Sequence, residues 1–383
     1  MSLNRKCLTL LSLGLILFCC ENDVRAQNKE DDVIRVETNV VFVDTLVRDK
    51  RTGAPVKDLT AENFELLDDG KPRKLSQFSR EGLSRRPLAL VLVLNLHSSG
   101  ILFLEKTEVM ESVISALSKL QPGDEVAIVQ TWYEPDGGEP YNFQIKSKTV
   151  QDLTRDRAKT LAALRGVQKF AERNLPQVES LFLFKKSAKD AVLSDISGTS
   201  EPPIGAADAP DYKHILDDAA RLAEQHPESQ FEIVEVTDDL DAEGFGKTTK
   251  TARRLVASNV TVNGLIMKRN LMDKMINTFG VLSPLIGERF HTISYYAKQT
   301  GGETAVVGRP EEFIAAVDKI IGGIAARYSL GFLLEEDATD DNRMHKLEVK
   351  VKTRNEQGKK REVTVSARHG YYRRKTSEQN TKR

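Results

Sequence analysis

An unbroken apolar run, Leu88–Leu94, constrains the fold of this chain more than any other feature. The run is rich in Leu and Val, and the polar residues Asn95, His97, Ser98 and Ser99 follow it at once. A run this short predicts a strand buried on both faces, which is typical of the centre of a parallel sheet. In open α/β sheets, ligands bind beyond the carboxyl ends of the strands. We therefore expect a functional site at this polar tip.

The segment around this strand alternates between strand and helix patterns. Further strands are predicted at 126–132, 141–145, 231–236, 260–267 and 304–307, and helices at 103–120, 155–170, 211–225, 247–258, 288–300 and 313–324. This alternation indicates an α/β fold with a doubly wound, mainly parallel sheet that helices cover on both faces. Residues 171–205 have no clear pattern, and within them 181–184 fits either a helical turn or a short strand.

Both flanks of the α/β segment have β patterns. Val33–Phe78 alternates in strand fashion and contains Asp68-Asp69-Gly70 between two β-prone runs, which is a specific hairpin signal. Strands are predicted again at 328–334, 347–351 and 363–367. We expect the two flanks to form one β-sandwich into which the α/β domain is inserted, with two separate small sheets as the alternative. The predicted parts are a signal peptide (1–26), an N-terminal β module (27–84), the α/β domain (85–326), C-terminal strands (327–375) and a disordered tail (376–383).

The first residues fit a secretory signal peptide. Arg5 and Lys6 precede the apolar run Leu8–Phe18, and Val24–Ala26 resembles a cleavage site. The run is too short to span a membrane. We therefore expect an exported protein, periplasmic or extracellular, with no transmembrane segment after signal removal.

The cysteines all lie in this N-terminal segment. The three of them, Cys7, Cys19 and Cys20, precede the predicted cleavage site, so we expect a mature chain with no disulfide and no cysteine metal site. Bulky Phe18 stands before Cys19, where a lipidation site has a small residue. This argues against a lipid anchor at Cys19 or Cys20.

Charge is balanced over the chain and uneven within it. The formal net charge is zero, which gives the molecule no overall attraction to nucleic acid, and we expect no nucleic-acid partner. Residues 343–383 carry 14 Lys or Arg and 4 Asp or Glu, a local net charge of +10. Such a segment fits binding to an anionic envelope surface. It equally fits solvent-facing positions of edge strands, where Lys blocks unwanted pairing.

Motifs along the whole mature chain carry a resemblance to a known family. They are Val40, Val47–Lys50, Leu59–Phe64, Asp68–Lys71, Leu88–Ser99, Val236–Asp239, Tyr296–Gly302, Arg327–Phe332 and Arg368–Tyr372. Their order resembles the bacterial, acidobacterial-type family related to the von Willebrand factor A (VWFA) domain. The resemblance implies a VWFA-like sheet and an exported protein with a ligand-binding or protein-binding role.

The same resemblance implies a metal-ion-dependent adhesion site, which is altered here. The family's Asp-x-Ser-x-Ser and its later Asp correspond to Asn95, His97, Ser99 and Asp238, and no Thr stands at 206–210. Asn95 brings no charge, and His97 offers nitrogen, which Mg²⁺ rarely accepts. We predict a degenerate ligand-binding site in which Ser99 and Asp238 are the metal-binding residues. We expect no cofactor, or weak binding of Mg²⁺ or another divalent cation, while Asn95 and Asp238 hydrogen-bond across the crevice.

Each sequence motif that could indicate a catalytic site is incomplete. Gly244–Thr248 resembles the end of a phosphate loop, but the first Gly of that motif is replaced by Asp241. His97 and Ser99 lack a third group that would orient them as a base and nucleophile, and the other histidines are scattered without ligand spacing. We expect no enzyme.

The sequence leads to two functional hypotheses. The first is an exported, non-catalytic adhesion-type protein that binds an unknown protein partner at the carboxyl edge of its sheet. The alternative is a structural envelope component that interacts through its β-sandwich and basic C-terminal segment, with the VWFA-like domain as an inert scaffold.

Overall fold

The computed structural model describes residues 40–80, 85–96, 99–135, 143–194, 213–237, 239, 245–268, 292–334, 341–354 and 358–373. The predicted signal peptide (1–26) and tail (376–383) lie outside the described residues. The structural statements below concern the described part alone.

A six-stranded sheet forms the centre of the α/β part. Its strands are β5 (Leu88–Asn95), β6 (Glu125–Pro135), β7 (Phe143–Thr154), β8 (Gln230–Thr237), β9 (Val260–Met267) and β10 (Thr304–Val307), in the order β10-β9-β8-β5-β6-β7. All neighbours are parallel except β7, which is antiparallel to β6 at the edge. Every residue of β5 is buried, as its apolar run predicts.

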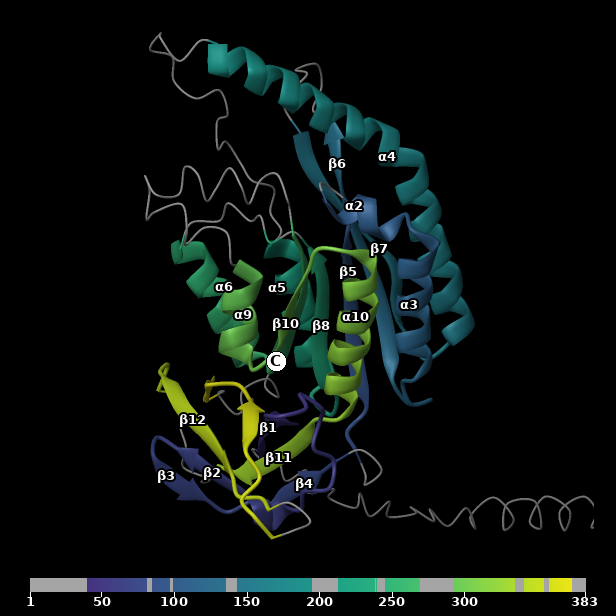
Figure 1. Ribbon diagram of the computed structural model, residues 1–383. Helices are drawn as coiled ribbons and strands as arrows, with labels where there is room; N and C mark the ends of the chain where they lie inside the picture. Colours follow the sequence, from purple (N-terminus) through teal and green to yellow (C-terminus); the bar gives the residue numbers. More distant parts are fainter. Residues whose placement is uncertain are drawn as a thin grey trace, which may run out of the picture. The chain divides into compact units, whose positions relative to one another are not determined.

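Helices cover both faces of this sheet (Figure 1). One face carries α2 (Ser99–Leu104), α3 (Thr107–Ser118), α4 (Arg157–Ser194) and α10 (Pro310–Ala325), and the other carries α5 (Lys213–Gln225), α6 (Phe245–Ala257) and α9 (Thr292–Thr300). Alternate side chains of β5 serve the two layers: Leu90 and Leu92 pack in the first core, and Val91 and Val93 in the second. The predicted doubly wound, mainly parallel sheet is confirmed.

Two further sheets are built from both ends of the chain. The first has the order β13-β1-β11-β4, with β13 at Val363–Ser366, β1 at Val40–Asp49, β11 at Tyr328–Leu333 and β4 at Gln77–Ser79. The second has the order β14-β12-β2-β3, with β14 at Gly370–Tyr372, β12 at Met344–Val351, β2 at Phe64–Asp68 and β3 at Lys71–Arg73; a 3₁₀ turn, η1 (Ala61–Asn63), precedes β2.

Their inner faces share one hydrophobic core that includes Val43, Leu66 and Tyr328. N-terminal and C-terminal strands alternate in the first sheet, and in the second the C-terminal pair β14-β12 joins the N-terminal pair β2-β3 through the β12–β2 contact. The predicted β-sandwich around an inserted α/β domain is thus confirmed, and the alternative of two separate small sheets is wrong.

Two elements differ from their predicted extent. The strand predicted to end at Ile145 continues to Thr154, because β7 is an edge strand whose polar residues face solvent and so lack the apolar signature of β5. The helix predicted to end at Phe170 continues to Ser194 and contains Pro176. It includes 181–184, which are therefore helical.

A buried ion pair joins the β-sandwich to the α/β part. Arg327, which precedes β11, is 1% exposed, and its Nε lies 3.0 Å from Oε1 of Glu232 in β8, which is fully buried. Glu232 also accepts hydrogen bonds from Gln230 (2.9 Å) and Asn263 (2.7 Å). Burial raises the pKa of Glu232, and the Arg327 guanidinium opposes that shift. The carboxylate is thus held by a single buried cation and two amides.

Three more arginines connect the two parts. Arg48 of β1 donates to both carboxylate oxygens of Glu303 at 2.7 and 2.6 Å. Arg86 lies 4.0 Å from the centre of the Phe42 ring and 3.4 Å from Asp44, which are both in β1. Arg368 donates to the backbone carbonyls of Val256, in the last turn of α6, and of Phe42 in β1. These hydrogen bonds and ion pairs therefore fix the position of the amino edge of the six-stranded sheet on the β-sandwich.

Removing the Arg327 cation should destabilise the whole chain. Arg327→Met leaves the Glu232 carboxylate buried without a counter-charge, so the free energy of unfolding should fall by about 3–5 kcal/mol in urea titrations at pH 7. The double variant Arg327→Met with Glu232→Gln should recover much of that loss. The matched control is Arg309→Met, which breaks an exposed pair with Glu312 and should cost far less, because water screens both charges. Equal losses for the two arginines would contradict this assignment.

Candidate functional site

The predicted binding residues belong to the carboxyl edge of the six-stranded sheet. β5 ends at Asn95 and the parallel strand β8 ends at Thr237, so both strands deliver their following loops to this edge. His97 and Asp238 lie outside the described residues. Ser99 begins α2, and its side chain also lies outside the described part. Of the four predicted residues, Asn95 is the one whose contacts the structure describes.

The Asn95 amide links three neighbouring strands. Its Oδ1 accepts a hydrogen bond from Thr131 Oγ1 of β6 (2.6 Å), and its Nδ2 donates to Glu235 Oε1 of β8 (3.1 Å). Asn95 is 1% exposed. An amide carries a donor and an acceptor on one carbon, so it can satisfy a hydroxyl on one side and a carboxylate on the other. The predicted hydrogen bonding of Asn95 and Asp238 across the crevice involves a residue outside the described part, and the described partners of Asn95, Thr131 and Glu235, were not predicted.

Gly100, in the first turn of α2, packs closely against Asn95 at the end of β5. A Cβ atom on Gly100 would lie 1.8 Å from the Asn95 carbonyl oxygen, so a side chain larger than hydrogen is excluded there. Gly100 is thus required for α2 to begin directly beyond β5.

Asp239 fixes the second loop. It has a φ of 54°, in the left-handed region, and it is 3% exposed. Its Oδ1 accepts a hydrogen bond from the Ile293 backbone at 2.8 Å, in the first turn of α9, and its own N–H donates to Thr237 Oγ1 at 3.1 Å. A carboxylate at a helix N-terminus satisfies free N–H groups and interacts favourably with the helix dipole. Asp239 therefore ties the end of β8 to α9.

These contacts bear on the predicted cation site. Mg²⁺ needs several oxygen ligands, preferably carboxylates. Among the described residues of this edge, the Asn95 amide is engaged on both atoms and Asp239 caps a helix. The side chains of Ser99 and Asp238 lie outside the described residues, so their assignment as metal ligands stays a prediction.

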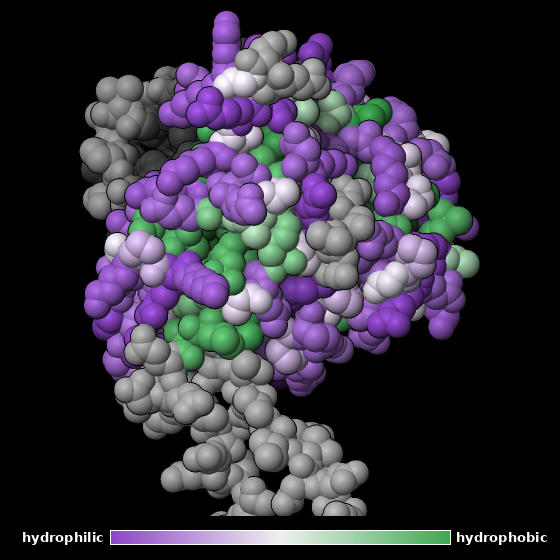
Figure 2. All heavy atoms as spheres, turned by 90° about the horizontal axis from the view of Figure 1, so that it is seen from below, coloured by the Kyte–Doolittle hydropathy of each residue, from purple (hydrophilic) through white to green (hydrophobic). Residues whose placement is uncertain are grey.

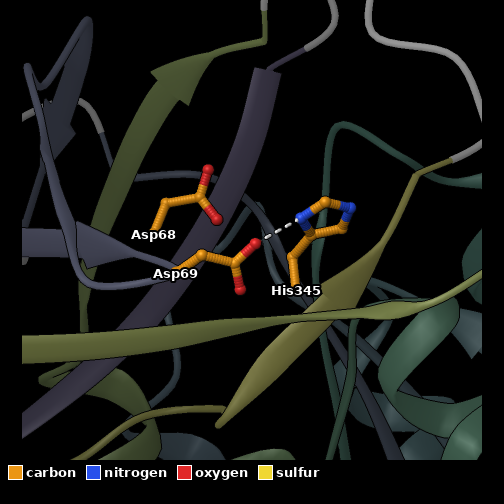
Figure 3. Close-up of side chains that lie close together, drawn as sticks. All are labelled: Asp68, Asp69 and His345. Carbon is orange, nitrogen blue, oxygen red and sulfur yellow. Dashed lines mark hydrogen bonds and ion pairs between the residues drawn. The ribbon is translucent and has the colours of Figure 1, made fainter. Parts of the chain in front are cut away.

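A second group of functional side chains lies in the β-sandwich. Asp68, Asp69 and His345, here called the Asp–His cluster, can each offer one metal-ligating atom, and these three atoms lie within 4.8 Å of one another. Asp68 is the last residue of β2. Asp69 and Gly70 both have positive φ and form the hairpin turn to β3. His345 comes from β12, which pairs with β2 (Figure 3).

Cations and N–H groups stabilise the carboxylate of Asp69. Its Oδ1 accepts from the Lys346 N–H at 2.9 Å, and its Oδ2 lies 2.9 Å from both Arg343 Nη2 and His345 Nδ1. The backbone N–H of Lys346, with further help from Arg343 and His345, lowers the pKa of Asp69 to about 2. Asp69 is therefore ionised near neutral pH.

Sequence reasoning missed this cluster. Asp69 and His345 are 276 positions apart, so no ligand spacing marks them. The Asp-Asp-Gly turn was predicted, but only as a hairpin. The pairing of β2 with β12 brings His345 to that turn, and a prediction of the pairing register would have been needed to find it.

Comparisons with known proteins add a set of similar structures. No family model matches the sequence, and no curated protein matches it. Similar solved structures include the conserved hypothetical protein BatB from Bacteroides thetaiotaomicron, which is 11% identical with a TM-score of 0.36 and covers 62% of this chain and 98% of that one. The SpRpn10 VWA domain is 13% identical with a TM-score of 0.34, and it covers 60% of this chain and 94% of its own.

A third similar structure is the manganese-loaded TRAP protein of Plasmodium vivax, which is 10% identical with a TM-score of 0.34 and covers 80% of this chain and 97% of that one. VWA-domain proteins are thus among the structures that this chain resembles. Similarities this weak transfer no residue role and no activity. The α/β class rests on the strand order and the helical layers of the chain itself.

Replacing Asn95 with Asp should show how the stability of the strand end depends on Glu235. Asn95→Asp places a carboxylate against that of Glu235 in a buried site, which raises the pKa of the pair. A raised carboxyl pKa in the folded state means that folding takes up a proton, so stability is lost as pH rises. Urea titrations should show a deficit of about 2–4 kcal/mol at pH 7 that shrinks toward pH 5. Adding Glu235→Gln should relieve it, and a deficit independent of pH would refute the argument.

Proposed function

We propose that this protein is an exported, non-catalytic binding protein that engages a protein partner at the carboxyl edge of its six-stranded sheet. The observation that carries the proposal is the way this edge is fixed. Asn95 joins three strands, and Asp239 ties β8 to α9. In the sequence, His97 and Ser99 follow Asn95 closely, and Asp238 directly precedes Asp239. The predicted binding residues therefore extend from anchored strand ends.

The described chemistry of this edge supports binding rather than catalysis. Asn95, Thr131 and Asp239 are buried, and their described hydrogen bonds run to other groups of the protein. General acid–base catalysis needs a titratable group within reach of a substrate proton. A buried amide and a helix-capping carboxylate instead provide a rigid base for loops, which suits recognition of a partner.

Export is supported by the N-terminal sequence. Among the described residues, no helix combines the length and apolar character that crossing a membrane requires. The proposal of a periplasmic or extracellular location therefore rests on the predicted signal peptide alone.

The alternative, a basic C-terminal segment that binds an anionic envelope surface, gains less support. Lys352 pairs with Glu65, Arg361 with Asp49, and Arg343 with Asp69. These acidic partners come from the N-terminal strands and turns, so part of the local positive charge is used within the sandwich. The face seen in Figure 2 is mainly hydrophilic, and its hydrophobic residues are interrupted by hydrophilic ones.

Site-specific photo-crosslinking in the native host tests the proposed surface. A photoreactive amino acid at position 97 or 99 should give a discrete adduct with a partner protein. Two positions serve as matched controls: Lys119, 61% exposed beside α3 at the amino edge of the sheet, and Lys350, 50% exposed on β12. Neither control should give that adduct.

The outcome distinguishes the two hypotheses. An adduct from position 350 in place of positions 97 and 99 would overturn the proposal and favour the β-sandwich as the working surface. Equal adducts from all positions would show that no defined binding edge exists. Deleting residues 343–383 is an unsuitable test, because it removes β12, β13 and β14 from the two sandwich sheets.

A further inference from the structure

We propose that the Asp–His cluster is a binding site for a divalent transition-metal ion, with His345 Nδ1 and one oxygen each from Asp68 and Asp69 as ligands. The site lies in the β-sandwich and is independent of the function proposed for the sheet edge. None of its three residues belongs to the predicted adhesion site.

The ligand atoms are nearly at bonding positions already. His345 Nδ1 lies 2.9 Å from Asp69 Oδ2, and the three atoms lie within 4.8 Å of one another. Metal bonds to imidazole nitrogen and carboxylate oxygen are about 2.0–2.2 Å long, so ligand atoms on one ion lie up to about 4.4 Å apart. A small movement of the ligand atoms toward one another would therefore let all three bind the same ion.

Asp68 supplies an independent sign of a missing cation. Its side chain is 2% exposed, and its Oδ2 accepts from Arg73 Nε (3.0 Å) and from the Tyr371 hydroxyl (3.2 Å). Its Oδ1 is buried and has no hydrogen-bond partner among the described residues. Figure 3 shows this carboxylate beside that of Asp69, with an oxygen directed toward it. A buried carboxylate oxygen without a partner is costly, and a metal ion placed between the two carboxylates removes that cost.

The surroundings orient the imidazole as a ligand. His345 Nε2 lies 3.1 Å from Asp341 Oδ2, and the ring stacks on Tyr371 with centroids 5.0 Å apart. A ring that donates its Nε2 proton to a carboxylate has the lone pair of Nδ1 available for an ion, which would then replace the present contact of Nδ1 with Asp69 Oδ2. Carboxylates hold many metal-bound histidines in this way and fix the tautomer.

The ligand types determine which ion suits the site, and the exposure of Asp69 determines how the ion can enter. A set of one nitrogen and two oxygens suits Zn²⁺ or Mn²⁺ better than Mg²⁺ or Ca²⁺. The Asp69 side chain is 34% exposed, which gives the ion a route from solvent.

Binding would join segments that are distant in the sequence. Asp68 and Asp69 lie in the N-terminal β2–β3 hairpin, and His345 lies in the C-terminal strand β12. An ion held by all three bridges the two ends of the chain. Because the ligands come together only in the folded state, the melting temperature should rise with the logarithm of the free ion concentration once that concentration exceeds Kd.

Calorimetric titration of the purified, chelator-treated protein with Zn²⁺ and with Mn²⁺ tests the proposal. We expect one equivalent per chain with micromolar affinity for at least one of the two ions. Asp69→Asn should weaken binding at least 10-fold while keeping the turn, because Asn adopts positive φ readily. His345→Gln should weaken it similarly. Asp318→Asn, which alters an exposed carboxylate on α10, should leave affinity unchanged.

Three results would overturn the proposal. The first is the absence of binding for both ions. Nitrogen chemical shifts that show His345 doubly protonated at pH 7 would then identify a proton as the cation of the cluster. The second is binding that Asp69→Asn and His345→Gln leave intact. The third is binding that Asp238→Ala abolishes, which would place the ion at the sheet edge instead.

Discussion

The buried pair of Arg327 and Glu232 is the contact on which the arrangement of this protein depends. Each charge is fully removed from water, so neither can be left alone without a large cost. Glu232 belongs to the central strand β8, and Arg327 introduces β11 of the sandwich. The pair therefore fixes the amino edge of the six-stranded sheet to the sandwich. The carboxyl edge points away from this junction, and its loops are left for recognition.

The main architecture could be predicted because it follows from burial. Strand β5 lies under helices on both faces, so Leu88–Leu94 is a continuous apolar run that few other structures would produce. The sandwich could also be predicted, since both flanks alternate in strand fashion. The full extent of the edge strand β7 was not predicted, for the opposite reason. β7 has one neighbouring strand and polar side chains, and it carries little of the burial signal.

The candidate sites could be predicted only in part. Asn95 and Asp238 are visible as polar residues at the ends of apolar strands, so the edge of the sheet was identified. The partners of Asn95 were not, because Glu235 lies inside a strand and reaches Asn95 only through the register of β5 and β8. The Asp–His cluster depends on a pairing between strands from opposite ends of the chain. Local sequence contains no information on such a pairing.

The interleaved strands also affect how the chain is made. β1 lies between β11 and β13, so Val43 meets Leu330 and Val47 meets Val365. When β1 leaves the ribosome, most of its neighbours have not been synthesised, while the strands and helices of the inserted α/β part follow one another closely. Contacts between distant residues form late because loop closure is costly. The inserted part should therefore fold first, and the nascent β1 is an exposed edge that a chaperone can protect until the last strands arrive.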